Sequence, residues 1–291
     1  MTSQLDAILA AGAVAFVCFF VAWAWGMLHG RDVSVTDVYY GFAPITQGLV
    51  AYVLWHRHSE RGAILLVLTA LWSIGLGQLL ISRVRANHGF GGEPRFLLAL
   101  EKYKPGKQLW WISLLILVLG QAVLVTVLNL PLLLTLTSKY DSIAVSDVVG
   151  YLVIGAGAVI EVVGNHQLER FRNDPRNKGK GRTLNTGLWA WSRHPNYFGN
   201  VLCYWGFFVV AIRDPNLWFT AIGPLAIYGL LRFGSGVKLT EFLMLEKRKG
   251  DPVYADYLAR TSPFMLRPPR RPGIRTVVPP TGSEGAAQSQ Q

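Results

Sequence analysis

A string of polar and aromatic residues, Arg193 to Tyr197, stands directly before an apolar run in the sequence GLWAWSRHPNYFGN (187–200). One Trp and one Arg are enough to anchor a helix at a membrane interface, so this string supplies more polar chemistry than anchoring requires. The guanidinium group of an Arg binds phosphate oxygens through two parallel hydrogen bonds. The string therefore predicts a binding site for a phosphate-bearing ligand at the edge of a membrane.

The segment that leads into this string is rich in basic residues and turn formers. Seven Lys and Arg residues are interleaved there with Asn, Gly and Pro: Arg170, Arg172, Arg176, Lys178, Lys180, Arg182 and Arg193. Guanidinium groups on a flexible backbone suit a phosphate-rich ligand. The alternative is that these charges only set membrane topology and contact anionic headgroups. We expect no nucleic-acid partner, because the basic residues lie against predicted membrane spans and no nucleic-acid-binding motif is present.

Ionisable and amide side chains also occur inside apolar runs. Glu161 and Asn165 are four residues apart and share one face of a predicted helix. Asp37 stands at the inner edge of another run, close to Tyr40. An ionisable residue at membrane depth indicates a functional site. The structural alternative is that Glu161 pairs with a neighbouring Arg and locks two helices together.

These residues are positioned by a chain with the composition of an integral membrane protein. Of its 291 residues, 51% are hydrophobic and only 15% are charged, against about 25% charged residues in soluble domains. A transmembrane helix needs about 20 apolar residues. Seven runs are candidates: 5–28, 38–55, 63–81, 109–136, 143–164, 197–212 and 217–237. The sequence therefore predicts an all-α, polytopic membrane protein with about seven transmembrane helices in residues 1–266.

The distribution of charge predicts the orientation of these spans. With the N-terminus outside, 23 of the 28 Lys and Arg residues lie in inner segments, while Arg57, Arg61, Lys139 and Arg213 lie in outer loops. Because cytoplasmic loops accumulate Lys and Arg, we expect an outer N-terminus and a cytoplasmic C-terminus, in a bacterial plasma membrane. Residues 267–291 have the composition of a disordered cytoplasmic tail. Both cysteines fall inside predicted spans, and no disulfide or metal site is indicated.

Four stretches of the chain resemble one known family. They are GEPRF (92–96), EVVGNHQLERFRNDPRNKGK (161–180), GLWAWSRHPNYFG (187–199) and KRKGDPVYADYLARTSPFMLRPP (247–269). In this order, over about residues 72–269, they look like the DUF1295 family, which is related to the C-terminal domain of steroid 5-alpha-reductases. The resemblance implies a seven-helix membrane reductase of lipid metabolism. NADPH would lie in a polar cavity open to the cytoplasm, and a lipophilic substrate would enter from the bilayer.

The resemblance also implies roles for individual residues. Asn196 would contact the nicotinamide side of the cofactor, Arg193 a phosphate or ribose, and Tyr197 and His194 would line the same pocket. The full set of expected cofactor contacts is Glu161, Asn165, Arg172, Lys178, Arg193, His194, Asn196, Tyr197, Asn200 and Arg232. The alternative from physical chemistry is that Asn196 caps the sixth span, while Trp189, Trp191 and Tyr197 form an interfacial belt.

The expected chemistry is hydride transfer from NADPH to a C=C bond. A donor must then stabilise the negative charge that develops on the substrate, and Asp37 and Tyr40 are the predicted catalytic residues. The chain departs from the family pattern at three positions, where Gly75, Asn165 and Asn200 replace charged residues.

Two other functions remain open from the sequence. One is an S-adenosylmethionine-dependent membrane methyltransferase of the isoprenylcysteine carboxyl methyltransferase type, which shares an Arg-His-Pro-x-Tyr turn. The other is a non-catalytic lipid-binding relative, which the three neutral replacements favour.

Overall fold

The computed structural model of the chain describes residues 3–29, 33–55, 58–87, 111–177 and 182–270. All regular secondary structure within these ranges is helical, apart from one isolated parallel bridge between Ser192 and Ser262. The predicted all-α fold class is therefore confirmed.

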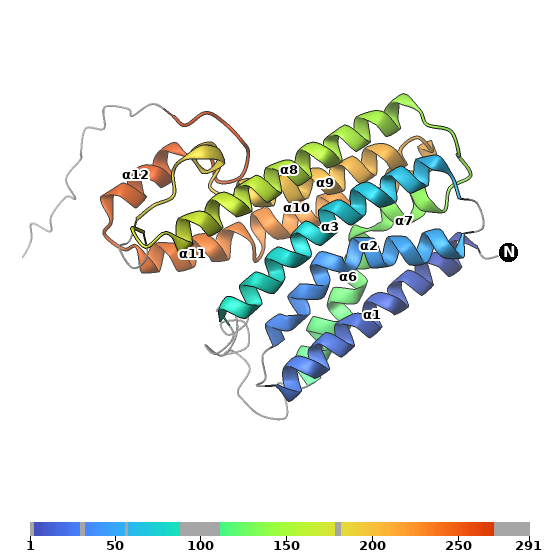
Figure 1. Ribbon diagram of the computed structural model, residues 1–291, viewed down its shortest axis with the longest axis horizontal. Coiled ribbons are helices and arrows are strands. Elements are labelled where there is room, and N and C mark those ends of the chain that lie inside the picture. The colour runs from blue at the N-terminus through green and yellow to red at the C-terminus, as the bar shows by residue number, and fades with distance from the viewer. Residues whose placement is uncertain (1–2, 30–32, 56–57, 88–110, 178–181, 271–291) are drawn as a thin grey trace, which may run out of the picture.

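The helices form an elongated bundle, with α11 and α12 gathered at the end opposite the N-terminus (Figure 1). Their bounds are α1 (Gln4–Leu28), α2 (Thr36–Leu54), α3 (Glu60–Asn87), α6 (Gln121–Leu128), α7 (Leu130–Leu136), α8 (Val145–Asn173), α9 (Pro195–Ala211), α10 (Ile222–Phe233), α11 (Val237–Lys247) and α12 (Pro252–Arg260). Four shorter elements connect them: the 3-10 turns η1 (Val33–Val35), η3 (Gly187–Ala190) and η4 (Pro215–Ala221), and the π-helical segment η2 (Leu114–Gly120).

Five helical segments of the described chain are long and apolar enough to cross a membrane: Gln4–Leu28, Glu60–Arg85, Trp111–Leu128, Val145–Asn173 and Pro215–Lys247. These are the helices of an integral membrane protein. The two other predicted spans correspond to α2 and α9. The 17 residues of α9 fall short of the usual length, and α2 contains Asp37, Pro44 and Gln47. The count of seven transmembrane helices therefore stays a prediction.

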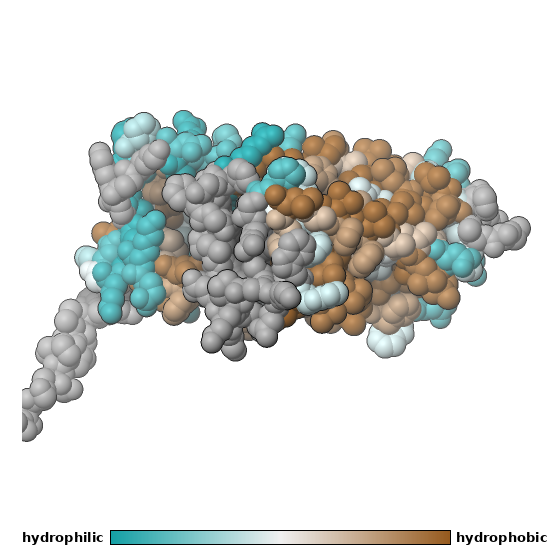
Figure 2. Space-filling model, turned by 90° about the horizontal axis from the view of Figure 1, so that it is seen from below, coloured by the Kyte–Doolittle hydropathy of each residue, from teal (hydrophilic) through white to brown (hydrophobic). Residues whose placement is uncertain are grey.

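The surface of the bundle is apolar where lipid would surround it. Figure 2 shows a hydrophobic belt between two hydrophilic ends. Large apolar side chains such as Leu71 of α3 and Leu152 and Val159 of α8 are more than half exposed. Exposed apolar area of this extent is unusual for a soluble monomer, so we assign the belt to contact with membrane lipids.

The predicted span 109–136 is not one continuous helix, because the helix is interrupted at Asn129, between α6 and α7. Pro131 lies in the first turn of α7, where its missing N–H group is tolerated. The Asn129 amide donates to Gln47 Oε1 at 2.7 Å, and the Gln47 amide donates to Thr126 Oγ1 at 2.8 Å. These hydrogen bonds join α2 to the two helices that flank the break.

A buried ion pair links α3 and α8 near the N-terminal end of the molecule. Arg61 Nε lies 2.7 Å from Asp147 Oδ1, and the two other guanidinium nitrogens donate to Ser138 Oγ at 3.0 Å and to the carbonyl of Val210 at 2.7 Å. The prediction that Arg61 lies in an outer loop is wrong: it lies in the first turn of α3 and is 2% exposed. A guanidinium group is tolerated inside because all its nitrogens are paired.

Close packing of α8 against α9 sets the geometry of the interior. Glycines recur seven residues apart on α8 (Gly150, Gly157 and Gly164) and on α9 (Gly199 and Gly206). A Cβ atom added to Gly199 would lie 2.5 Å from the carbonyl oxygen of Gly157. Small residues of this kind let helix backbones approach closely in membranes, and here they bring polar side chains of α8 and α9 into contact.

Candidate functional site

The loop before α9 is held against α8 by two hydrogen bonds. Gly187 has a φ of +60°, a conformation that glycine adopts at little cost. Gln167 Oε1 accepts a hydrogen bond from the backbone N–H of Leu188 at 3.0 Å. The Trp189 indole donates to the carbonyl of Gly164 at 2.9 Å. Trp189 is therefore buried against α8, and the prediction that it belongs to an interfacial belt is wrong.

The turn into α9 places Asn196 on the interface with α8. The helix begins at Pro195, and His194 occupies the N-cap position. The fixed φ of proline suits the first helical turn. The alternative in which Asn196 caps the helix is wrong, because Asn196 lies inside the first turn and its amide donates to Asn165 Oδ1 at 2.9 Å.

Four residues form a buried polar cluster between α8 and α9: Glu161, Asn165, Asn196 and Asn200, each between 4% and 8% exposed. Trp72 Nε1 of α3 donates to Glu161 Oε2 at 2.7 Å. Asn200 Nδ2 lies 3.3 Å and 3.4 Å from the two carboxyl oxygens of Glu161. In the described part of the chain, the hydrogen-bond partners of Glu161 are thus neutral, and it forms no helix-locking pair with an Arg.

Two acceptor atoms of this polar cluster are unsatisfied. Asn196 Oδ1 and Asn200 Oδ1 are buried and accept no hydrogen bond. A buried polar atom without a partner costs about 1–3 kcal/mol. The two residues are four positions apart and so share one face of α9. Together they offer adjacent acceptors to a ligand that carries N–H or O–H donors.

A cavity of about 260 Å³ lies beside the polar cluster, between α3 and α8. Glu161 and Asn165 line it from α8, and Trp72 and Gly75 line it from α3. A Cβ atom at Gly75 would contact only Val162 Cγ2, at 3.5 Å. The packing of the helices therefore does not require glycine at this position. The absence of a side chain leaves room in the cavity wall.

The three departures from the family pattern meet at this place. Gly75 and Asn165 line the cavity, and Asn200 contacts Glu161, which lines it as well. The three positions at which the resemblance predicts charged residues are far apart in the sequence and lie around one carboxyl group.

Tyr40, one of the two predicted catalytic residues, lies beside the polar cluster. It packs against the hydrophobic core that contains Trp72 and Tyr204. The Tyr204 ring packs edge-on against Trp72 with 5.4 Å between the ring centroids. Through Trp72 these tyrosines are connected to Glu161. Asp37 lies in the first turn of α2, one turn before Tyr40.

Arg193 turns away from the polar cluster toward the C-terminal helices. Its Nε atom lies 3.1 Å from Glu241 Oε1 of α11, but neither atom has an aligned hydrogen bond. Its Nη1 atom donates to the carbonyl of Leu258 at 3.3 Å, and its backbone N–H donates to the carbonyl of Ser262 at 2.8 Å. The guanidinium group therefore forms a close ion pair with Glu241 that lacks an aligned hydrogen bond.

His194 belongs to the same group of contacts. Its Nε2 atom lies 3.5 Å from Glu241 Oε1, and its ring stacks on Tyr197 with 5.2 Å between centroids. Burial lowers the pKa of His194, and the positive charges of Arg193 and Arg232 lower it further, against an opposing effect of Glu241. The imidazole is therefore neutral at pH 7.

The expected cofactor contacts thus fall into two groups that contact different helices. Asn196 and Asn200 contact α8, whereas Arg193 and His194 contact Glu241 of α11. The structure brings the first set together with Glu161 and Asn165, and it stacks His194 of the second set on Tyr197. The charge of Arg232 lowers the pKa of His194. Both sets flank the first turns of α9.

The basic segment before α9 is described in part. Arg172 lies in the last turn of α8, and Arg176 pairs with Asp174 at 2.8 Å. The predicted contact Lys178 and the motif at 92–96 lie outside the described residues, as does the predicted tail from residue 271. The backbone of Arg267 still donates to the carbonyl of Trp191 at 3.1 Å. Within the described ranges, no group of three or more His, Cys, Asp or Glu side chains is placed to hold a metal ion.

Sequence reasoning missed three residues of this region. Trp72 and Tyr204 carry no signal, since an aromatic residue within an apolar run is most often core packing. Glu241 does carry one, because it is an acidic residue directly before the apolar run FLML in KLTEFLMLEK.

A family model described as "Protein of unknown function (DUF1295)" matches residues 22–261, which is more than half of the chain. The match begins ahead of residue 72, where the resemblance starts, and so includes Asp37 and Tyr40. No curated protein and no solved structure matches the chain.

Proposed function

From the premise that the chain belongs to the DUF1295 family, whose description names no activity, we propose that it is an NADPH-dependent membrane oxidoreductase. It would reduce a C=C bond of a lipophilic substrate, of a steroid-like, isoprenoid or other lipid type, that enters from the bilayer. The cofactor supplies the hydride when it is bound. The residues of the chain bind it, orient it and stabilise charge on the substrate.

One observation carries this proposal: the two unsatisfied acceptors, Asn196 Oδ1 and Asn200 Oδ1, inside the α8–α9 interface. A primary carboxamide, the substituent of the nicotinamide ring, has two N–H donors and one carbonyl acceptor. Its donors would satisfy the orphan oxygens and remove a cost of about 1–3 kcal/mol for each. This complementarity of donors and acceptors supports the proposal that the buried cluster binds the nicotinamide end of the cofactor.

The basic residues around the start of α9 suit the anionic end. The charges of Arg193 and Arg232 both lower the pKa of His194, and guanidinium groups bind phosphate oxygens strongly. Glu241 pairs with Arg193 at 3.1 Å without an aligned hydrogen bond. A phosphate group would compete with Glu241 for this guanidinium. Arg172 and Lys178 remain candidates for the 2′-phosphate that distinguishes NADPH from NADH.

The other residues of the cluster would position the reacting groups. Glu161 accepts hydrogen bonds from Trp72 and Asn200 and thereby orients both side chains. The Tyr40 hydroxyl is an O–H donor beside the cluster and would stabilise the oxygen of an enone substrate, as an oxyanion hole does. Asp37 is the alternative donor if its carboxyl group is protonated.

The second candidate is an S-adenosylmethionine-dependent methyltransferase. The observation that favours it is the presence of two carboxyl groups, Glu161 beside the cavity and Glu241 beside Arg193. Acidic groups suit the positively charged sulfonium of S-adenosylmethionine, which carries no phosphate.

Calorimetric titration of the detergent-purified protein with NADPH, NADH and S-adenosylmethionine separates these functions. The proposal predicts saturable binding of NADPH, weaker binding of NADH and no binding of S-adenosylmethionine. Tight binding of S-adenosylmethionine without NADPH binding would establish the methyltransferase instead. Binding of none of the three would favour the non-catalytic lipid-binding alternative.

The variant Arg193→Ala tests the anionic end of the site. Loss of a charge-assisted hydrogen bond, about 1.5–3 kcal/mol, should weaken NADPH binding roughly ten- to a hundredfold. Arg176→Ala is the matched control, because Arg176 is an exposed guanidinium already paired with Asp174. If Arg193→Ala and Asn196→Ala both bind NADPH like the parent, the string before α9 serves as a membrane anchor only.

A further inference from the structure

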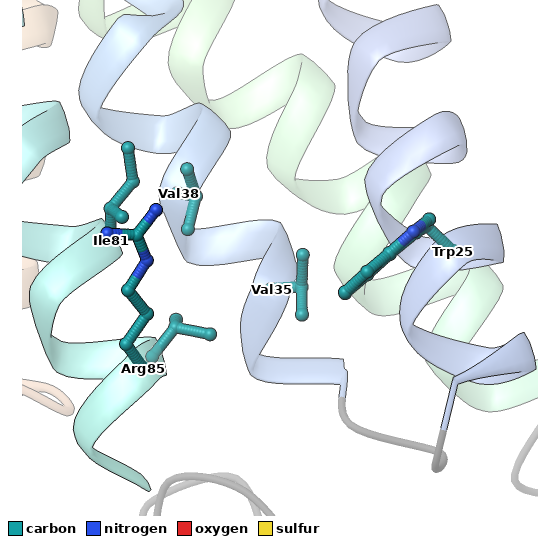
Figure 3. Close-up of a pocket in the computed structure, with 6 residues that line it drawn as sticks. Trp25, Val35, Val38, Ile81 and Arg85 are labelled. Carbon is teal, nitrogen blue, oxygen red and sulfur yellow. The ribbon is translucent and has the colours of Figure 1, made fainter. Parts of the chain in front are cut away.

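A second pocket, apolar and of about 270 Å³, lies between the ends of α1 and α3 and the start of α2. It is lined by Trp25, Val35, Val38, Ile81, Val84 and Arg85. Figure 3 shows Trp25 extending from α1 toward Val35, and the Arg85 side chain running along α3 with its guanidinium group beside Ile81 and Val38. Among the described residues that line the pocket, Arg85 is the one that carries a charge.

The lining residues place this pocket at the level of lipid headgroups. Trp25 is 47% exposed in the last turns of α1, and its ring stacks on His29 with 4.6 Å between centroids. Tryptophan rings of membrane helices concentrate at the membrane–water interface. Arg85 lies in the last turn of α3, where a long basic side chain covers apolar surface with its stem and presents its charge to the headgroups.

The charge of the pocket selects among membrane lipids. In the described part of the chain, Arg85 makes no hydrogen bond or ion pair. A guanidinium group without a carboxylate partner pairs well with a phosphate. The other described residues of the lining are apolar and suit a hydrocarbon chain, and they add no second positive charge for a free, water-soluble anion.

We propose that this pocket binds one anionic phospholipid of the adjacent leaflet. The phosphate lies on Arg85, and the first part of an acyl chain lies along Val35, Val38 and Val84. The site does not depend on the proposed reductase activity. It distinguishes anionic lipids from zwitterionic ones, because a neutral headgroup lacks the net charge that Arg85 attracts.

Native mass spectrometry of the full chain in mixed micelles tests this proposal. With equal amounts of phosphatidylglycerol and phosphatidylcholine, the parent should retain one phosphatidylglycerol preferentially. Arg85→Gln should lower this retention roughly tenfold, and Val38→Trp should lower it by filling the pocket. Arg83→Gln is the control, because Arg83 lies on the same helix but does not line the pocket.

Equal retention of the two lipids by the parent would overturn the proposal. So would unchanged retention in Arg85→Gln, or an equal loss in Arg83→Gln, which would show a general effect of charge. Retention unaltered in Val38→Trp would overturn the placement of the acyl chain. Size-exclusion chromatography of each variant confirms that it is folded, and an excess of inorganic phosphate should not displace the lipid.

Discussion

The substitution Gly199→Ala tests whether contact between α8 and α9 builds the polar cluster. Gly199 precedes Asn200 and lies against Glu161. An added Cβ atom would lie 2.5 Å from the carbonyl oxygen of Gly157 and 2.6 Å from the backbone nitrogen of Glu161. Both neighbours are backbone atoms of α8, so they cannot turn aside as a flexible side chain can.

The magnitude follows from this geometry. Contacts between unbonded carbon and its neighbours are favourable near 3.5–4.0 Å, so the helices must separate by about 1 Å. Overpacking of this kind costs about 1–3 kcal/mol. The hydrogen bond from Asn200 to Glu161 is already 3.3 Å long, and a further separation would break it. Gly199→Ala should therefore lose both stability and the cluster that binds the ligand.

Gly155→Ala is the matched control for this experiment. Gly155 lies in α8 as well, but a Cβ atom there would meet nothing within 4 Å. Replacing a helical glycine by alanine without a clash stabilises by about 0.4–1 kcal/mol, through the entropy of the unfolded chain. The control should therefore unfold at the same temperature as the parent or slightly above it.

Thermal unfolding in detergent, followed by circular dichroism, measures both variants. The reasoning predicts a lower unfolding temperature for Gly199→Ala and no loss for Gly155→Ala. Equal unfolding temperatures for the two variants would refute the claim that backbone contact between α8 and α9 holds the site together.

The remaining predictions concern the cofactor phosphate, the pH dependence of stability and the topology. Neutralising Arg172 and Lys178 together should raise the dissociation constant of NADPH much more than that of NADH, and less so in high salt because exposed charges are screened over about 8–10 Å; an equal change for both cofactors would contradict it. The folded-state pKa of His194 is lowered by burial, so its contribution to stability is complete above about pH 6.5 and is lost as the pH falls below that value. His194→Gln should flatten the fall of the unfolding temperature between about pH 6.5 and pH 5; a slope equal to that of the parent would contradict it. A single cysteine at Asn177 should be labelled only from the cytoplasmic side and one at Lys139 only from outside; labelling of both from one side would refute the predicted orientation.

Local sequence patterns were sufficient to predict some features of the site. The apolar runs predict the long helices, because helix formation in lipid depends on composition over about 20 residues. The spacing of Glu161 and Asn165 predicts that they share a face of α8, and both line the same cavity. The side to which a helical residue points follows from its position along one helix.

Other features depend on contacts between distant residues, which no local pattern contains. Arg61 is buried because Asp147, far along the chain, lies opposite it. Trp72 contributes to the site because it meets Glu161 across two helices. Arg193 and Asn196 are three residues apart yet face different helices, because the chain turns between them at Pro195. Tertiary packing determines which helix each of these side chains contacts, and the local sequence does not.

The central claim is that the buried cluster between α8 and α9 binds the nicotinamide end of NADPH. The most direct test is the NADPH dissociation constant of Asn196→Ala, with Asn216→Ala as the control, since Asn216 is an exposed amide that bonds only to Asp214 in the described chain. Loss of a neutral hydrogen bond, about 0.5–1.5 kcal/mol, predicts roughly two- to tenfold weaker binding for Asn196→Ala and no change for the control. An unchanged dissociation constant in a folded Asn196→Ala variant would contradict the account.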